Sequence, residues 1–221
     1  MRAVIFDMDG VIFDSERAYI ECWKPIEKEF GILDLEDTMF KCIGVNSNMT
    51  KKIFTEKYGA DFPLEKYQQM ASVSMRNLVD SGKLPKKKGI DELLEFLKTK
   101  RIPMAVASST KSETVKRELK MAGILEYFDV IVGGDMVEKS KPEPDIFLEA
   151  AEQLGAQPGE CTVIEDSHNG IRAAYAAGMT AIMVPDLLEP NDEMREKATC
   201  IFESLVEVRK YLLLSYKPPT D

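Results

Sequence analysis

The sequence contains a single histidine, His168, in 221 residues. This scarcity excludes a metal site built from several histidines and any mechanism that depends on more than one of them. Cysteine is also scarce, and the four thiols are scattered without a C-x-x-C pair: Cys22, Cys42, Cys161 and Cys200. Their spacing argues against a zinc site or a disulfide framework and indicates reduced thiols in a cytoplasmic protein.

Long apolar runs and an excess of basic residues are absent as well. No stretch reaches the roughly 20 apolar residues that a transmembrane helix requires, and Asp7 and Asp9 interrupt the region where a signal peptide would have its apolar segment. The 29 Lys and Arg against 38 Asp and Glu give a net charge of −9, which argues against nucleic acid and anionic membranes as partners. We therefore expect a soluble, monomeric, cytoplasmic protein whose partner is a small molecule.

Short apolar runs alternate with helical patterns over most of the chain. The runs that predict strands cover residues 3–6, 102–107, 129–132, 161–164, 180–184 and 199–202. Helical patterns of about ten residues accompany the later runs, at 90–99, 111–121, 144–154, 169–176 and 204–213. Because strands that alternate with helices form a parallel sheet with helices on both faces, the sequence predicts an α/β protein with a doubly wound parallel sheet.

One long segment interrupts this alternation and has no strand pattern. Between residues 15 and 83, helical patterns cover about 15–30, 36–43, 48–58 and 64–80. Ser15 is the expected N-cap of the first of these helices, and Pro25 is expected to kink or interrupt it. The lysine run at 86–88 is typical of a solvated face. We predict a core of residues 1–14 and 84–221 with an inserted helical domain of residues 15–83.

Polar residues follow several of the predicted strands. Because the carboxyl ends of parallel strands meet at one edge of a sheet, we expect one crevice to contain Asp7, Asp9, Ser108, Glu165 and Asp166. Carboxylates packed this closely repel one another and need a cation, a shared proton or a shifted pKa. Four carboxylates without a histidine or cysteine cluster form an all-oxygen site, which predicts Mg²⁺.

These residue types fit the parts of a phosphoryl-transfer reaction. Asp7, on a rigid strand end, is suited to nucleophilic attack on phosphorus. Asp9 is close enough in sequence to protonate a leaving oxygen and then to activate water. Ser108 can hold a phosphate oxygen, and Ser109 and Thr110 lead into a helix N-terminus, whose free N–H groups favour an anion.

Each of these residues also has an ordinary structural explanation when it is taken alone. A strand-end serine or a Glu-Asp pair is usually a cap or part of a turn. Lys141, in a loop before a helix, would balance the carboxylates and the phosphate, but Lys139 is an equally charged competitor nearby. The specificity lies in the order along the chain, which is D-x-D-G, then a strand-end serine, then a lysine loop, then E-D.

Four stretches resemble the motifs of the haloacid dehalogenase superfamily, and more narrowly those of its β-phosphoglucomutase-like branch of phosphatases and mutases: FDMDGVIFDSE, VASST, KSKPEPDIF and VIEDSHNGIRAAYAAGM. The resemblance covers essentially the whole chain and includes a helical cap inserted after the first motif. It implies that Asp7 is the nucleophile and Asp9 the general acid and base.

The resemblance also implies ligands for the metal and the phosphate. Mg²⁺ would be held by the Asp7 carboxylate, the Asp9 backbone carbonyl and Asp166, with Glu165 as a further ligand or acting through water. The phosphoryl group would be bound by Ser108 and Lys141. The Pro-x-Pro-Asp that follows Lys141 fixes the register and selects it over Lys139.

The leading interpretation is a Mg²⁺-dependent phosphatase of small phosphorylated metabolites such as sugar phosphates, acting through an aspartyl phosphate on Asp7. A β-phosphoglucomutase-type mutase is the alternative. In the family's hexose-phosphate mutases, a histidine of the first cap helix resembles part of the device that couples cap closure to acid and base action. Tyr19 takes that position here, which favours the phosphatase. Asp9 argues against dehalogenase chemistry, and Asp9 together with the inserted helices argues against a phosphoacceptor regulatory domain.

Overall fold

The computed structural model describes residues 2–43 and 47–215. The chain forms two compact units, one of residues Met1–Phe13 and Lys86–Asp221 and the other of residues Asp14–Pro85. None of the described helices combines the length and apolar character that crossing a membrane requires.

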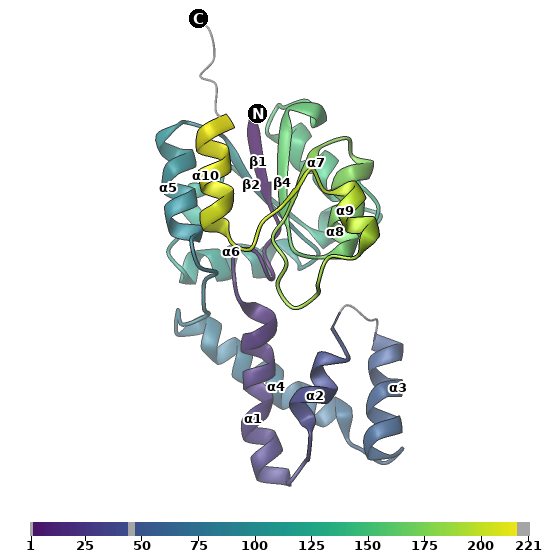
Figure 1. Ribbon diagram of the computed structural model, residues 1–221. Coiled ribbons are helices and arrows are strands. Elements are labelled where there is room, and N and C mark those ends of the chain that lie inside the picture. The colour runs from purple at the N-terminus through teal and green to yellow at the C-terminus, as the bar shows by residue number, and fades with distance from the viewer. Residues whose placement is uncertain (1, 44–46, 216–221) are drawn as a thin grey trace, which may run out of the picture. The chain divides into compact units, whose positions relative to one another are not determined.

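The larger unit is built on a six-stranded parallel sheet, which confirms the predicted fold class (Figure 1). Its strands are β1 (Ala3–Phe6), β2 (Met104–Ser108), β3 (Val130–Gly133), β4 (Cys161–Glu165), β5 (Thr180–Met183) and β6 (Cys200–Ile201). The strand order β3-β2-β1-β4-β5-β6 places β1 between β2 and β4. Phe6 pairs with Val106 on β2 and with Ile164 on β4, so these three strands end side by side.

Helices cover both faces of this sheet because its strands are apolar on both faces. Ala3 and Ile5 of β1 belong to one apolar cluster with Phe147 and Ile171, which lie on α7 (Asp145–Gln153) and α8 (His168–Ala176). On the other face, α5 (Ile90–Thr99) packs against α10 (Leu205–Ser215) (Figure 1). The helix α6 (Ser112–Met121) follows β2 and packs against β3.

Four short elements were not apparent from periodicity. They are the 3₁₀ helices η1 (Leu125–Tyr127), η2 (Gly134–Met136) and η3 (Pro158–Glu160), and the helix α9 (Asp192–Lys197). Elements this short do not complete an apolar period, so pattern analysis misses them. The start of α9 nevertheless has a signal in the sequence, which is Asn191, a residue type that often caps helices. In the structure its side chain accepts a 2.9 Å hydrogen bond from the Met194 N–H.

The smaller unit is helical, with α1 (Ser15–Phe30), α2 (Leu35–Phe40), α3 (Ser47–Tyr58) and α4 (Leu64–Asp80). The helix α1 packs along α4. Aromatic rings join α1 and α3 to the segment that precedes α4: the Trp23 and Phe54 centroids lie 5.8 Å apart, and those of Tyr58 and Phe62 4.7 Å apart. Trp23 and Phe54 are buried in the core of the unit, whereas Tyr58 and Phe62 are half-buried at its edge.

The expected N-cap of α1 was wrong, and so was the expected interruption of this helix. Ser15 is the first helical residue rather than the N-cap, and Asp14 takes the cap position without a side-chain hydrogen bond. Pro25 does not interrupt the helix, which continues to Phe30. A proline removes one hydrogen bond from a helix interior, and here the packing of the amphipathic face against α4 outweighs that loss.

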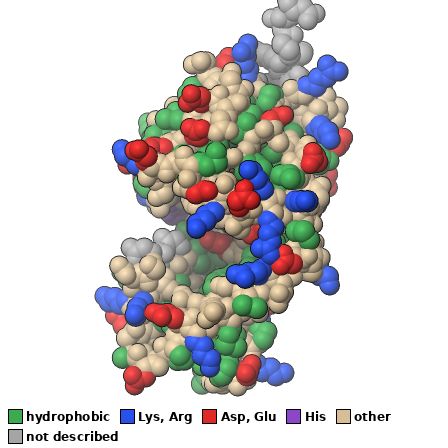
Figure 2. Space-filling view, turned by 180° about the vertical axis from the view of Figure 1, so that it is seen from behind, with side chains coloured by type: hydrophobic (Ala, Val, Ile, Leu, Met, Phe, Trp, Pro, Cys, Tyr) green, Lys and Arg blue, Asp and Glu red, His purple; other side chains and the backbone are tan. Residues whose placement is uncertain are grey.

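The lysine run is not a uniformly solvated face, contrary to expectation. Lys86 pairs with Asp91 at 2.5 Å, whereas Lys87 pairs at 2.6 Å with Asp186, a carboxylate with no exposed surface. On the face drawn in Figure 2, acidic and basic side chains are interspersed with apolar and neutral ones. Such a mixed surface is in keeping with the modest negative net charge of −9.

Candidate active site

The candidate site lies where the three central strands end. Asp7 follows β1, Ser108 is the last residue of β2, and Glu165 is the last residue of β4, with Asp166 directly after it. Asp7, Ser108 and Glu165 are almost completely buried. Because buried polar groups are costly unless they are paired, their partners define what this site can do.

Lys141 is the cation that links these strand ends. Its ammonium group donates hydrogen bonds to an oxygen of Asp7, to Glu165 Oε1 at 2.8 Å and to the Ala107 carbonyl at 3.2 Å. The ammonium also lies 4.8 Å from the centroid of the Phe147 ring. Its side chain is only 6% exposed, so water contributes little to its solvation. The lysine is therefore fixed between the ends of β1, β2 and β4.

The charges in this cluster shift one another's protonation. Burial opposes the charged form of Lys141, but the Asp7 and Glu165 carboxylates outweigh it and raise the pKa of Lys141 above its ordinary value. Burial raises the pKa of Asp7, and the charge of Lys141 opposes that rise. One ammonium thus faces several carboxylates, and an additional cation would favour the ionised form of Asp7.

Three carboxylates form a group that could hold this cation. Oxygen atoms of Asp7, Glu165 and Asp166 all lie within 4.8 Å of one another. Gly10 leaves room for Asp166, because a Cβ atom at Gly10 would lie 2.3 Å from Asp166 Oδ2. Gly10 also has a φ of +82°, a conformation that other residues rarely adopt. The donors are all oxygen, which fits a hard cation such as Mg²⁺.

Glu165 has a second role that the sequence did not indicate. While Oε1 accepts from Lys141, Oε2 accepts a 2.6 Å hydrogen bond from the Ser167 N–H at the start of α8. Gly170 in that helix makes the approach possible, because a Cβ atom there would lie 1.7 Å from Glu165 Oε1. Glu165 therefore fixes the position of Lys141 as well as belonging to the acidic group.

The other predicted residues lie around the loop that follows β2. Asp9 accepts a 3.2 Å hydrogen bond from the Thr110 hydroxyl, and Ser108 Oγ accepts one of 3.1 Å from the Thr110 N–H. Ser109 is exposed. From the sequence, Thr110 was predicted only to lead into a helix, and its position in the sequence gave no indication of a contact with Asp9. The Ala107 carbonyl and Phe147 were not predicted as partners of Lys141 at all.

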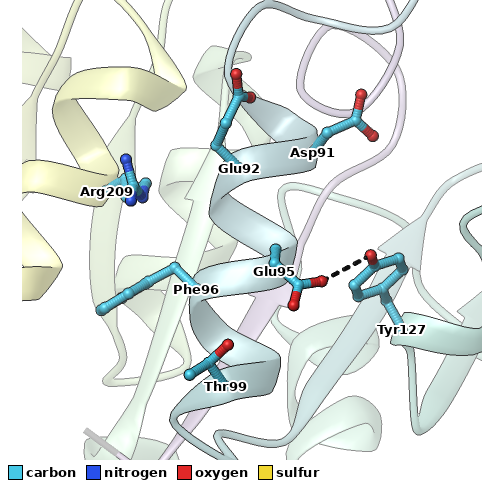
Figure 3. Close-up of a pocket in the computed structure, with 7 residues that line it drawn as sticks. All are labelled: Asp91, Glu92, Glu95, Phe96, Thr99, Tyr127 and Arg209. Carbon is cyan, nitrogen blue, oxygen red and sulfur yellow. Dashed lines mark hydrogen bonds between the residues drawn. The ribbon is translucent and has the colours of Figure 1, made fainter.

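A separate hollow lies outside this site, along α5 (Figure 3). It has a volume of about 620 Å³ and is lined by residues of α5 together with Tyr127 and Arg209. Several of its polar groups pair with one another or with a neighbour: the Tyr127 hydroxyl donates to Glu95 at 3.0 Å, and Asp91 pairs with Lys86 at 2.5 Å. None of the predicted site residues lines it, and we place the candidate site at the strand ends.

Comparison with known proteins gives consistent matches. The family described as "Haloacid dehalogenase-like hydrolase" matches residues 4–184. A phosphorylated carbohydrates phosphatase of Thermotoga maritima is 36% identical over 82% of this chain and 84% of its own length. A fructose-1-phosphate phosphatase of Escherichia coli is 35% identical over 82% of this chain and 95% of its own. The crystal structure of a putative β-phosphoglucomutase from Thermotoga maritima matches with a TM-score of 0.82 and 32% identity, over 98% of this chain and all of that one.

Proposed function

This chain belongs to the haloacid dehalogenase-like hydrolases, and we propose that it hydrolyses phosphomonoesters of small metabolites such as sugar phosphates. The observation that carries the proposal is the buried arrangement of Asp7, Lys141 and Glu165, with Asp166 adjoining it. A nucleophilic carboxylate, a fixed cation and an acidic group able to hold a metal are the parts that phosphoryl transfer through an enzyme carboxylate requires.

In the first step, an oxygen of Asp7 attacks the phosphorus atom and the bond from phosphorus to the leaving oxygen breaks. Asp9 donates a proton to that leaving oxygen, which departs as an alcohol. Lys141 and the Ser108 hydroxyl bind oxygens of the phosphoryl group, together with Ser109 at the start of the following loop. The product of this step is an aspartyl phosphate on Asp7.

In the second step, Asp9 takes a proton from a water molecule, and that water attacks the phosphorus atom of the aspartyl phosphate. The bond from phosphorus to the Asp7 oxygen breaks, and the carboxylate is restored. Lys141 keeps two partners throughout, because Glu165 and the Ala107 carbonyl also accept hydrogen bonds from its ammonium group. Inorganic phosphate then leaves.

We propose Mg²⁺ as the cofactor of this site. Asp7, Asp166 and the backbone carbonyl of Asp9 would hold the ion, and Glu165 would contribute through water. The bound ion supplies positive charge that stabilises the negative oxygens of the transferring phosphoryl group. The all-oxygen donors and the space left by Gly10 support this choice.

Release of phosphate from p-nitrophenyl phosphate and from a panel of sugar phosphates, in the presence of Mg²⁺, tests the proposal. We expect many turnovers per molecule, and we expect Asp7→Asn to abolish them because an amide does not attack phosphorus. One equivalent of p-nitrophenol at most, with the phosphoryl group kept on the protein, would contradict hydrolysis and indicate a phosphoacceptor. More than a few per cent of activity in folded Asp7→Asn would contradict the nucleophile.

A mutase is the second candidate, because the putative β-phosphoglucomutase is similar over nearly the whole chain. The only histidine, His168, lies in α8 of the larger unit, where its ring nitrogen contacts the Glu189 carbonyl at 2.9 Å. Incubation with β-glucose 1-phosphate, Mg²⁺ and a trace of glucose 1,6-bisphosphate separates the two activities. We expect free phosphate to exceed glucose 6-phosphate, and the reverse would make the protein a mutase.

A further inference from the structure

We propose that Thr110 is a positioning residue for Asp9, an inference that rests on the proposed phosphatase function. The Thr110 hydroxyl donates a hydrogen bond of 3.2 Å to Asp9 Oδ2. The two residues are 101 positions apart in sequence and come from the ends of neighbouring strands, β1 and β2. The contact therefore exists only because the sheet brings these ends together.

The loop that carries Thr110 is held on both sides. Its N–H donates to Ser108 Oγ at 3.1 Å, and its carbonyl accepts a 3.0 Å hydrogen bond from the Gly134 N–H. The end of β3 approaches this loop so closely that Cβ atoms at Gly133 and Gly134 would lie 2.2 Å from Ser112 N and 2.4 Å from Ser109 O. These contacts hold the Thr110 backbone in place before any substrate binds, and from that backbone the hydroxyl reaches Asp9.

A second anchor fixes the start of α6, two residues after Thr110. Asp135 accepts hydrogen bonds from the Ser112 N–H at 2.7 Å and from the Ser112 hydroxyl at 3.0 Å. Thr110 is thus enclosed between two restrained points of the chain. A donor held this rigidly limits the rotation of a carboxylate that it contacts, because other orientations lose the hydrogen bond.

The chemical consequence concerns the leaving group. In the first step, a proton on Asp9 must lie in line with the leaving oxygen at the moment the bond from phosphorus breaks. By fixing Oδ2, Thr110 sets the plane in which the Asp9 carboxyl delivers that proton. A poor leaving group depends on this proton, whereas a stabilised anion such as p-nitrophenolate leaves without it. Loss of the Thr110 hydroxyl therefore lowers the rate most for poor leaving groups.

The test compares kcat/KM for phenyl phosphate and p-nitrophenyl phosphate, which share a ring and differ in leaving group. For Thr110→Val, we expect kcat/KM with phenyl phosphate to fall about tenfold more than with p-nitrophenyl phosphate. Thr110→Ser keeps the hydroxyl and should restore the wild-type ratio. Thr114→Val removes a hydroxyl from α6 outside the site and should leave the ratio unchanged, with thermal unfolding confirming that each variant is folded.

The outcomes separate this inference from the proposed function. An equal fractional loss with both substrates would mean that Thr110 supports the site only structurally, and would overturn the inference while leaving the phosphatase intact. A ratio that Thr110→Ser does not restore would also overturn it. Absence of turnover by the wild-type protein with either substrate would overturn the phosphatase function, and the role of Thr110 with it.

Discussion

The Lys87 ammonium lies 2.6 Å from Asp186 Oδ1, although the two residues are 99 positions apart. The Asp186 side chain has no exposed surface, and that of Lys87 is 19% exposed. The Lys87 N–H also donates to the Ile12 carbonyl at 2.9 Å, just after the D-x-D-G turn. Through its side chain and its backbone N–H together, Lys87 therefore joins the loop that follows β5 to the region after β1.

We predict that Lys87→Met lowers the free energy of unfolding by about 3 kcal/mol, because it removes the cation beside a buried carboxylate. Adding Asp186→Leu should recover part of the loss, since the double variant has no buried charge at this position. Urea denaturation measures both. Lys86→Met is the matched control and should cost about 0.5 kcal/mol, because its partner Asp91 is 56% exposed. Equal losses for the two lysines would refute the prediction.

Lys141 and Lys139 form a second matched pair. Lys141→Ala should lower kcat about 100-fold, because it removes a preorganised donor to the phosphoryl group. Lys139→Ala should leave kcat within about twofold, since surface charges away from the site have small effects. Steady-state kinetics with p-nitrophenyl phosphate measures both, and circular dichroism shows whether each variant is folded. A larger loss in Lys139→Ala than in Lys141→Ala would show that Lys139, and not Lys141, binds the phosphoryl group.

Removal of divalent metal should abolish activity. EDTA should stop phosphate release and excess Mg²⁺ should restore it, because several carboxylates and a phosphate dianion repel one another without a cation. Asp166→Asn should raise the Mg²⁺ concentration needed for half-maximal activity about tenfold or more. Glu160→Gln, at the opposite end of β4, is the control and should leave it unchanged. Full activity in EDTA would contradict the proposed cofactor.

Gly170→Ala should lower activity even though alanine favours a helix. The added Cβ would lie 1.7 Å from Glu165 Oε1, so the carboxylate must move away from Lys141. We expect a drop in kcat of about tenfold or more, because the lysine loses the partner that positions it. Gly159→Ala adds a Cβ where nothing lies within 4 Å and serves as the control. Unchanged kinetics in Gly170→Ala would show that Lys141 does not depend on Glu165.

Glu118 on α6 should make stability depend on pH. Burial, with the charge of Asp9 adding to it and Arg117 opposing it, raises the pKa of Glu118 to about 7 from 4.5. The folded state therefore keeps this proton to a higher pH than the unfolded state, and the group's contribution to stability falls as pH rises from about 4.5 to 7. Glu118→Gln should raise Tm relative to wild type more at pH 8 than at pH 5.

The control for this measurement is Glu113→Gln on the same helix, where the side chain is 88% exposed. Its difference in Tm from wild type should be the same at both pH values. A Glu118→Gln variant that also gave equal differences would show that Glu118 ionises alike in the folded and unfolded protein.

The sequence by itself determined the fold class and the edge of the sheet where polar residues gather. Apolar runs and helical periods are local properties, and they predicted all six strands within about two residues at each end. The placement of Asp7, Ser108 and Glu165 at strand ends follows from the same local boundaries. Because parallel strands share one carboxyl edge, the strand order along the chain is enough to predict that these side chains lie near one another.

Only the tertiary structure decided which of these groups contact one another. The bonds from Lys141 to Glu165, from Thr110 to Asp9 and from Lys87 to Asp186 each join distant parts of the chain. A hydrogen bond depends on positions accurate to a fraction of an ångström, whereas sequence periodicity places a residue only on a face or at an end. The continuation of α1 past Pro25 also depends on packing, because tertiary contacts stabilise a helix more than local propensity does.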